Sequence, residues 1–143
     1  MMVVVLIIGI LASIGLPYYK KTIETSKATD SIAIGHMLSN SYRMFELDYP
    51  GVNLSGSLSN GCNSGGCSTS DYTACRLVRC NYVAPQDWDS SAYIFSVGLS
   101  CGGGNTACTH RNNGNGVYAN WGYNFDSAGA CFNLNGAPSC PQF

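Results

Sequence analysis

Charged side chains are scarce in this sequence. Only 10% of its 143 residues are Asp, Glu, Lys or Arg, and the formal net charge is −1 at a sequence pI near 6.0. The chain therefore lacks the excess of Lys and Arg with which proteins neutralise a phosphate backbone, and we expect no strong binding of nucleic acid. Because 45% of the residues are hydrophobic, the composition is not that of a disordered chain, and the length is typical of one domain.

Groups that perform catalysis are also few. The two histidines, His36 and His110, fall in a predicted helix and in a loop rich in Gly and Asn, respectively. The sequence shows no motif that combines a nucleophile with a general base and a general acid. Gly102 to Gly104 lack the following Lys-Ser/Thr pair of a phosphate-binding loop, so we predict a turn there. We therefore expect no enzymatic activity and no cofactor, and keep a secreted disulfide-rich enzyme only as a remote alternative.

A metal site is not expected either. Asp87 and Asp89 flank Trp88, but a calcium ion takes about six to eight oxygen ligands and no calcium-loop pattern surrounds these two carboxylates. Arg76 and Arg79 are predicted to be solvated, and together with the few other basic residues they are too sparse for a nucleic-acid surface.

No cysteine precedes position 62, and eight occur from there on. So many cysteines in a chain this poor in metal ligands indicate an oxidising compartment. Structural zinc sites usually show two close Cys pairs, a pattern that this spacing fits only loosely, so zinc is the weaker alternative. The spacing favours pairing between neighbours in the chain, while the other connectivities stay open. The predicted pairs are Cys62–Cys67, Cys75–Cys80, Cys101–Cys108 and Cys131–Cys140.

The first 16 residues carry no charge at all and have the composition of a membrane segment. As a helix they would measure about 24 Å, short of the hydrocarbon thickness of about 30 Å. Lys20 and Lys21 follow this run and nothing basic precedes it, which by the positive-inside rule would leave the cysteines in the cytoplasm. Both conflicts disappear if the natural chain starts earlier, with a basic leader and a few more apolar residues.

A cleaved signal peptide is the alternative for this segment, but the run shows neither a basic start nor a small-x-small cleavage site. It passes instead through Pro17, where a bend is expected, into a predicted helix that Pro50 and Gly51 end. An apolar stripe at helical spacing predicts one buried helix face. Its members are Ile34, Leu38, Tyr42, Phe45 and Tyr49, widened by Ala33, Met37 and Met44.

The remainder of the chain divides into a loop and a sheet. Residues 50–91 show no sustained period and are predicted to be a loop held by disulfides, with short turns of helix or strand near 74–83. Apolar residues then alternate with polar ones over 93–100 and 117–125, and 130–134 forms a third short strand. The predicted fold class is α+β, a long N-terminal α-helix packed on a small antiparallel β-sheet with disulfide-stapled loops.

The string VVVLIIGILASIGLPYYKK resembles the N-terminal helix of type IV pilins and of type II secretion pseudopilins. Gly9, Ala12, Leu16 and Pro17 fall where that pattern has its Gly, Ala, Leu and Pro. The resemblance covers about the first 30 residues. The family's leader, its methylated N-terminal Phe and its acidic fifth residue would all precede Met1.

This resemblance implies a pilin-like structural subunit of an extracellular filament. Residues 1–17 would form a transmembrane and filament-core helix, and 18–143 a globular head. The partners implied are further copies of the chain, the inner membrane before assembly, a prepilin peptidase, a platform protein and a cytoplasmic ATPase. A periplasmic pseudopilin, or a minor pilin with an adhesive or DNA-capturing tip role, are the alternatives.

The residues expected in the filament core lie on the apolar helix, where small side chains allow helices to approach closely. They are Met1, Val4, Leu6, Ile8, Gly9, Ile10, Ala12, Ser13, Gly15, Leu16 and Pro17.

Overall fold

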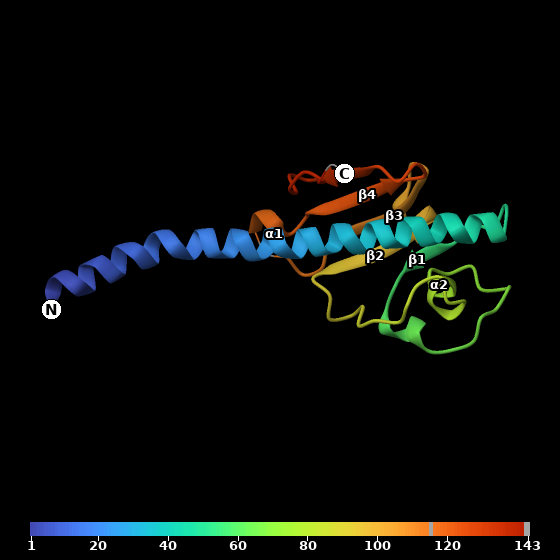
Figure 1. Cartoon of the computed structure of the whole chain (residues 1–143), viewed down its shortest axis with the longest axis horizontal. Coiled ribbons are helices and arrows are strands. Elements are labelled where there is room, and N and C mark those ends of the chain that lie inside the picture. Colours follow the sequence, from blue (N-terminus) through green and yellow to red (C-terminus); the bar gives the residue numbers. More distant parts are fainter. Residues whose placement is uncertain (115, 142–143) are drawn as a thin grey trace.

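A single long helix and a five-stranded sheet make up the computed structural model, which describes residues 1–114 and 116–141. Residues 115, 142 and 143 of the predicted head lie outside the described residues. Figure 1 shows α1 running the length of the molecule, with its first half projecting from the head. The helices are α1 (Met2–Asp48) and α2 (Cys75–Arg79), with short 3-10 turns η1 (Asn60–Asn63), η2 (Leu99–Cys101) and η3 (Gly116–Tyr118). The strands are β1 (Ser55–Ser57), β2 (Tyr93–Gly98), β3 (Asn105–Arg111), β4 (Gly122–Asp126) and β5 (Cys131–Leu134).

The helix α1 is unbroken for 47 residues, and Pro17 lies inside it. In place of a sharp bend at Pro17, the exposed half of α1 curves gently (Figure 1). The helix ends where predicted, because the Tyr49 N–H donates to the Phe45 carbonyl at 2.9 Å and Pro50 cannot continue the helical pattern. Gly51 then takes a φ of +81°, the left-handed conformation that glycine adopts without steric cost.

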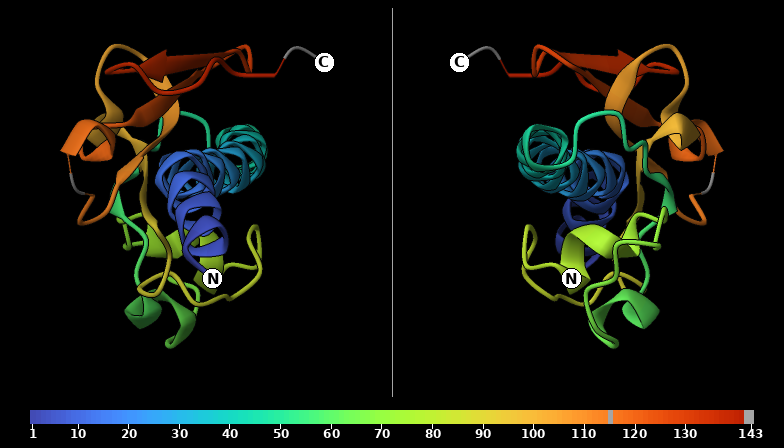
Figure 2. Two further views of the ribbon diagram at one scale, coloured as in Figure 1. Left: turned by 90° about the vertical axis from the view of Figure 1, so that its left-hand side faces the viewer. Right: turned by 90° about the vertical axis from the view of Figure 1, so that its right-hand side faces the viewer.

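The five strands form one antiparallel sheet in the order β1-β2-β3-β4-β5, so every strand pairs with its neighbour in the chain. The side chains on one face of β2, β3 and β4 are buried, and this face contacts the second half of α1. Figure 2 shows the sheet covering one side of α1. The predicted α+β architecture is therefore confirmed.

The sequence patterns miss two strands and place one too early. The segment 105–111 begins inside the predicted Cys101–Cys108 loop and shows no strand pattern, because its buried side chains, Thr106, Ala107 and Thr109, are small or polar. The three residues of β1 are too few to show an alternation. The predicted strand 117–125 is shorter than expected, since 116–118 form a 3-10 turn and β4 begins at Gly122.

The contact between α1 and the sheet relies on small residues of the helix. A Cβ atom on Gly35 would lie 2.2 Å from Cε2 of Phe125, so only glycine allows this approach. One turn further along, the hydroxyls of Ser39 and Thr106 lie 2.7 Å apart in the core, and Thr106 also donates to strand carbonyls. The backbone of α1 therefore lies close to the strands at this face, and the interface between helix and sheet is partly polar.

All eight cysteines are paired, which leaves no thiolate as a zinc ligand. The structure contains two of the predicted bonds, Cys101–Cys108 and Cys131–Cys140. The other two predicted pairs are wrong, because Cys62 bonds to Cys75 and Cys67 bonds to Cys80. The turn of α2 places Cys75 and Cys80 beside the two earlier cysteines. Each bond joins cysteines 13 residues apart, and the two overlapping disulfide loops interlock the lobe formed by residues 60–80.

Arg76 fixes this lobe to the end of α1, against the expectation that it is solvated. Its side chain is 1% exposed, and its guanidinium lies 4.9 Å from the ring centre of Phe45 and 4.5 Å from that of Tyr49. Its Nη1 donates to two carbonyls, at 3.2 Å from Thr69 O and 3.3 Å from Asp71 O. A cation held by two aromatic faces and two carbonyl oxygens stabilises the lobe, and no carboxylate among residues 1–114 and 116–141 forms an ion pair with it.

Replacing Gly35 by alanine tests the close approach of helix and sheet. Alanine ordinarily stabilises a helix interior by about 1 kcal/mol relative to glycine, but here the methyl group overlaps the Phe125 ring. We expect the free energy of unfolding to fall by about 1–3 kcal/mol, measured by denaturant unfolding of the full chain in detergent micelles. The control Asn40→Ala, exposed on the same helix, should not destabilise, and a stabilised Gly35→Ala variant would contradict the packing.

Peptide mapping without reduction tests the cysteine pairing. Cleavage of the denatured chain before Asp71 and after Arg76 and Arg79 yields one segment with Cys62 and Cys67, one with Cys75 and one that begins at Cys80. Because the first segment bonds to both of the others, mass spectrometry should find all three joined. Neighbour pairing would instead release the first segment alone.

Candidate assembly surface

The first third of α1 is an apolar surface without a partner in the monomer. All twelve large apolar side chains from Met1 to Leu16 are more than half exposed, and no residue of this stretch contacts the head closely enough to be buried. By length and composition α1 is able to cross a membrane, and its most apolar window is entirely unburied. The predicted filament-core residues, from Met1 to Pro17, therefore all lie on this projecting segment and surround it on every side.

A second apolar surface lies on the part of α1 that packs on the head. Met44 is 60% exposed and Leu47 is 82% exposed, while Met37 and Ala33 precede them at helical spacing. We call Ala33, Met37, Met44 and Leu47 the outer stripe. At about 100° per residue, its members project within roughly 40° of the direction opposite the buried helix face. Figure 2 shows that one side of α1 is covered by neither the sheet nor the lobe.

The outer stripe corrects one prediction. Ala33, Met37 and Met44 were expected to widen the buried face, but they are exposed. The small residues Ser31, Gly35 and Ser39 are buried instead, and at Gly35 the missing side chain lets the backbone of α1 approach the Phe125 ring. Leu38, Tyr42 and Phe45 are buried and Ile34 and Tyr49 are half-buried, so the narrower predicted stripe is confirmed.

An ion pair ties α1 to the sheet where the helix leaves the head. Arg111 Nε donates to Glu24 Oε2 at 3.0 Å and Arg111 Nη2 donates to Glu24 Oε1 at 3.2 Å, while Lys27 Nζ lies 3.1 Å from the same carboxylate. Arg111 Nη1 also donates to the carbonyls of Ala92 and Asn112 at 2.7 Å. The hydrogen bonds from Arg111 hold the pKa of the Glu24 carboxyl below its ordinary value of 4.5.

An open pocket of about 420 Å³ lies beside this ion pair, and we call it the basal pocket. Its walls come from the start of the packed half of α1 and from the turn between β3 and β4. They include Lys20, Ile23, Glu24, Arg111, Asn113 and Tyr118. No carboxylate in the described part of the chain lies within ion-pair distance of Lys20.

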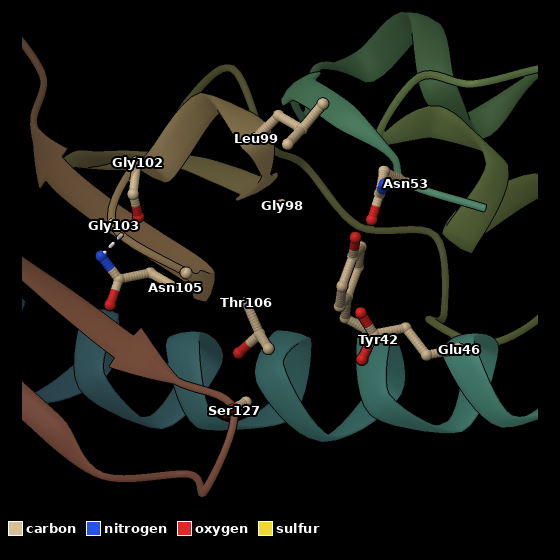
Figure 3. A pocket seen from close by; sticks show the side chains of 11 residues that line it. Tyr42, Glu46, Asn53, Gly98, Leu99, Gly102, Gly103, Asn105, Thr106 and Ser127 are labelled. Carbon is tan, nitrogen blue, oxygen red and sulfur yellow. Dashed lines mark hydrogen bonds between the residues drawn. The ribbon is translucent and has the colours of Figure 1, made fainter. Parts of the chain in front are cut away.

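A smaller pocket of about 200 Å³ lies near the other end of the head, between α1 and the glycine turn (Figure 3). Gly102, Gly103 and Gly104 form the predicted turn inside the Cys101–Cys108 loop, all with positive φ. The hydroxyl of Tyr42 points toward Asn53 and accepts a long hydrogen bond of 3.4 Å from the Leu54 N–H. The three glycines therefore allow the tight turn of this disulfide loop, because each adopts a positive φ.

The other polar residues noted in the sequence make structural contacts. Asp87 Oδ1 accepts from the Asn60 amide at 2.8 Å, and this bond keeps the pKa of Asp87 below its ordinary value. His36 packs edge-on against Phe125, and His110 is exposed on β3 instead of in a loop. Within residues 1–114 and 116–141, no group of three or more His, Cys, Asp or Glu side chains is placed to hold a metal ion.

No protein-family model matches this sequence, and no curated protein or solved structure matches it either. The class of protein therefore follows from the architecture. A long helix whose first third is apolar and projects from the head, and whose second half packs on an antiparallel sheet, is a pilin-like fold. The disulfides and the apolar helix together favour a membrane-attached protein whose head lies outside the cytoplasm.

Acid titration of the Glu24–Arg111 pair yields a prediction. Because the folded-state pKa of Glu24 lies below its unfolded value, the pair stabilises the fold above pH about 4.5, and this contribution is lost as the pH falls through the folded pKa. Glu24→Gln should lower the free energy of unfolding by about 1–2 kcal/mol at pH 7 and by much less at pH 3. Urea unfolding at both pH values measures this difference. Asp30→Asn, which removes an exposed carboxylate of the same helix, should cost less than about 0.5 kcal/mol, and a Glu24→Gln effect independent of pH would contradict the assignment.

Proposed function

We propose that this chain is the structural subunit of an extracellular helical filament of the type IV pilus kind. In this proposal the first third of α1 anchors the subunit in the inner membrane, and assembly later moves that segment into a bundle of identical helices. The observation that carries the proposal is the exposed apolar surface of α1, which covers the projecting segment and recurs as the outer stripe on the side of the helix opposite its buried face.

The projecting segment cannot remain in water. Burying a large apolar side chain is favourable by about 1.5–3 kcal/mol, so leaving twelve of them exposed costs on the order of 20 kcal/mol. That exceeds the whole stability of an ordinary domain, about 5–15 kcal/mol. A lipid bilayer removes the cost before assembly, since a helix satisfies its own backbone hydrogen bonds in hydrocarbon.

Helix packing removes the same cost after assembly. Within the membrane the helices gain little hydrophobic energy from one another, and close contact depends on small residues such as Gly9, Ala12, Ser13 and Gly15. Outside the membrane the apolar surface must be shielded by neighbouring subunits. The outer stripe then serves as the part of the head that faces the core of the bundle, because it lies in line with the apolar segment and opposite the sheet.

A filament of this kind fits the remaining features of the chain. In an oxidising environment, four disulfides stabilise the head. They add to the stability of a small hydrophobic core, which by itself is marginal. The family resemblance of the N-terminal helix adds the expected machinery, namely a prepilin peptidase that removes a leader, an inner-membrane platform protein and a cytoplasmic ATPase. The role of the chain itself in this proposal is structural and not catalytic.

Substituting the outer stripe tests the proposal. Met44→Glu should reduce the amount of subunit recovered in sheared surface filaments of the source cells by at least about tenfold, because a carboxylate would be buried between helices. Leu99→Glu makes the same change at an apolar side chain that is 69% exposed elsewhere on the head. That control should assemble as the unsubstituted chain does.

Both variants should fold, since neither residue is buried, and the membrane fraction of each should contain the same amount of oxidised subunit. Filament yields that fall equally for the two variants would contradict a specific role of the outer stripe. Absence of the unsubstituted chain from every sheared filament fraction would contradict the proposed function itself.

A further inference from the structure

The basal pocket lies at a defined height above the membrane segment. Lys20 follows Pro17 by three residues and Glu24 follows it by seven, which corresponds to about 4.5 and 10 Å along the helix axis. The bilayer measures about 30 Å across its hydrocarbon and about 40–45 Å with its headgroups, so each headgroup layer is roughly 5–8 Å thick. If α1 spans the membrane up to Pro17, the mouth of the basal pocket lies within the headgroup layer.

The side chains around this level fit such a position. Tyr18 and Tyr19 are 73% and 65% exposed, and exposed aromatic residues of this kind favour the interface between lipid and water. Figure 1 shows η3, which contributes Tyr118 to the pocket, at the edge of the head nearest the apolar half of α1. The pocket therefore lies at the end of the head nearest the apolar segment and not at its distal end.

The charges in the pocket favour a phosphate group. Glu24 is neutralised by Arg111 and Lys27, which both contact its carboxylate. Lys20 lines the same pocket without an ion-pair partner in the described part of the chain, and its ammonium is thus the available charge. Ile23 and Tyr118 add apolar walls, against which the glycerol and upper acyl carbons of a lipid pack.

We propose that the basal pocket binds the headgroup of an anionic phospholipid in the leaflet that faces the head. Lys20 contacts the phosphate, and the Glu24–Arg111 pair fixes the depth and shape of the site. The bound lipid holds the head at one height and orientation on the membrane, and it is released when the subunit leaves the bilayer. This inference rests on the proposed membrane anchoring.

A pair of adjacent lysines provides the test. Lys20→Gln and Lys21→Gln remove the same charge at nearly the same depth, but only Lys20 lines the pocket. The full chain is extracted from vesicles that contain equal amounts of phosphatidylglycerol and phosphatidylcholine, and native mass spectrometry counts the lipids retained on the monomer. The unsubstituted chain and Lys21→Gln should retain one phosphatidylglycerol in preference to phosphatidylcholine, and Lys20→Gln should lose this preference by about tenfold.

A second variant separates shape from charge. Ile23→Trp narrows the pocket and leaves every charge in place, so it should also reduce retention of phosphatidylglycerol. Equal losses for Lys20→Gln and Lys21→Gln would overturn the inference, because a diffuse basic surface would then explain the preference. A second copy of the chain retained in place of lipid would overturn it too.

Membrane insertion is measured in parallel. A chain that stays in the membrane through alkaline extraction but shows no lipid preference overturns only the lipid site. If alkaline extraction releases the chain from the membrane, the result contradicts both the membrane anchoring and the lipid site that depends on it.

Discussion

The close approach of α1 to the sheet at Gly35 is the constraint on which the rest of the structure depends. The Phe125 ring occupies the space where a side chain would otherwise stand, and the Ser39–Thr106 hydroxyl pair lies in the same interface. Both contacts fix the rotation of α1 about its own axis. Once that rotation is fixed, the outer stripe must point away from the head, and the apolar segment before Pro17 extends the same helix beyond the sheet.

The two ends of the packed half of α1 are secured by different chemistry. Near the projecting segment, Glu24 binds Arg111, whose guanidinium also donates to the carbonyls that border β2 and follow β3. At the far end, Arg76 lies against Phe45 and Tyr49, and the interlocked disulfides hold the short helix that carries it. Tyr82 adds a hydrogen bond to Asp48, and this bond raises the pKa of the tyrosine to about 12. The packed half of α1 is thus secured to the head at both of its ends.

The structural features that the sequence predicts correctly are those that depend on residues close together in the chain. The unbroken run from Met2 to Asp48, its end before Pro50 and the strands near 93–98 and 122–126 were all accessible, because helical and strand periodicity are local properties. The disulfides Cys101–Cys108 and Cys131–Cys140 were also accessible, since cysteines separated by 7 and 9 residues close short loops easily. The strand β3 was not, because its inward positions are small and polar and become buried only through contact with α1.

The sequence by itself determined that an apolar helix precedes a disulfide-bonded head, because charge, hydrophobicity and cysteine count are properties of composition. The tertiary structure alone decided which side of that helix is free. Gly35 and Ser39 are less hydrophobic than Met37 and Met44, yet they face the sheet, because the Phe125 ring leaves no space for a side chain at Gly35 and Ser39 bonds to Thr106. It also decided that Cys62 bonds to Cys75, since α2 brings together cysteines that spacing would pair differently. Which side chains are buried depends on how the helix and the sheet pack together, and a local sequence pattern does not contain that information.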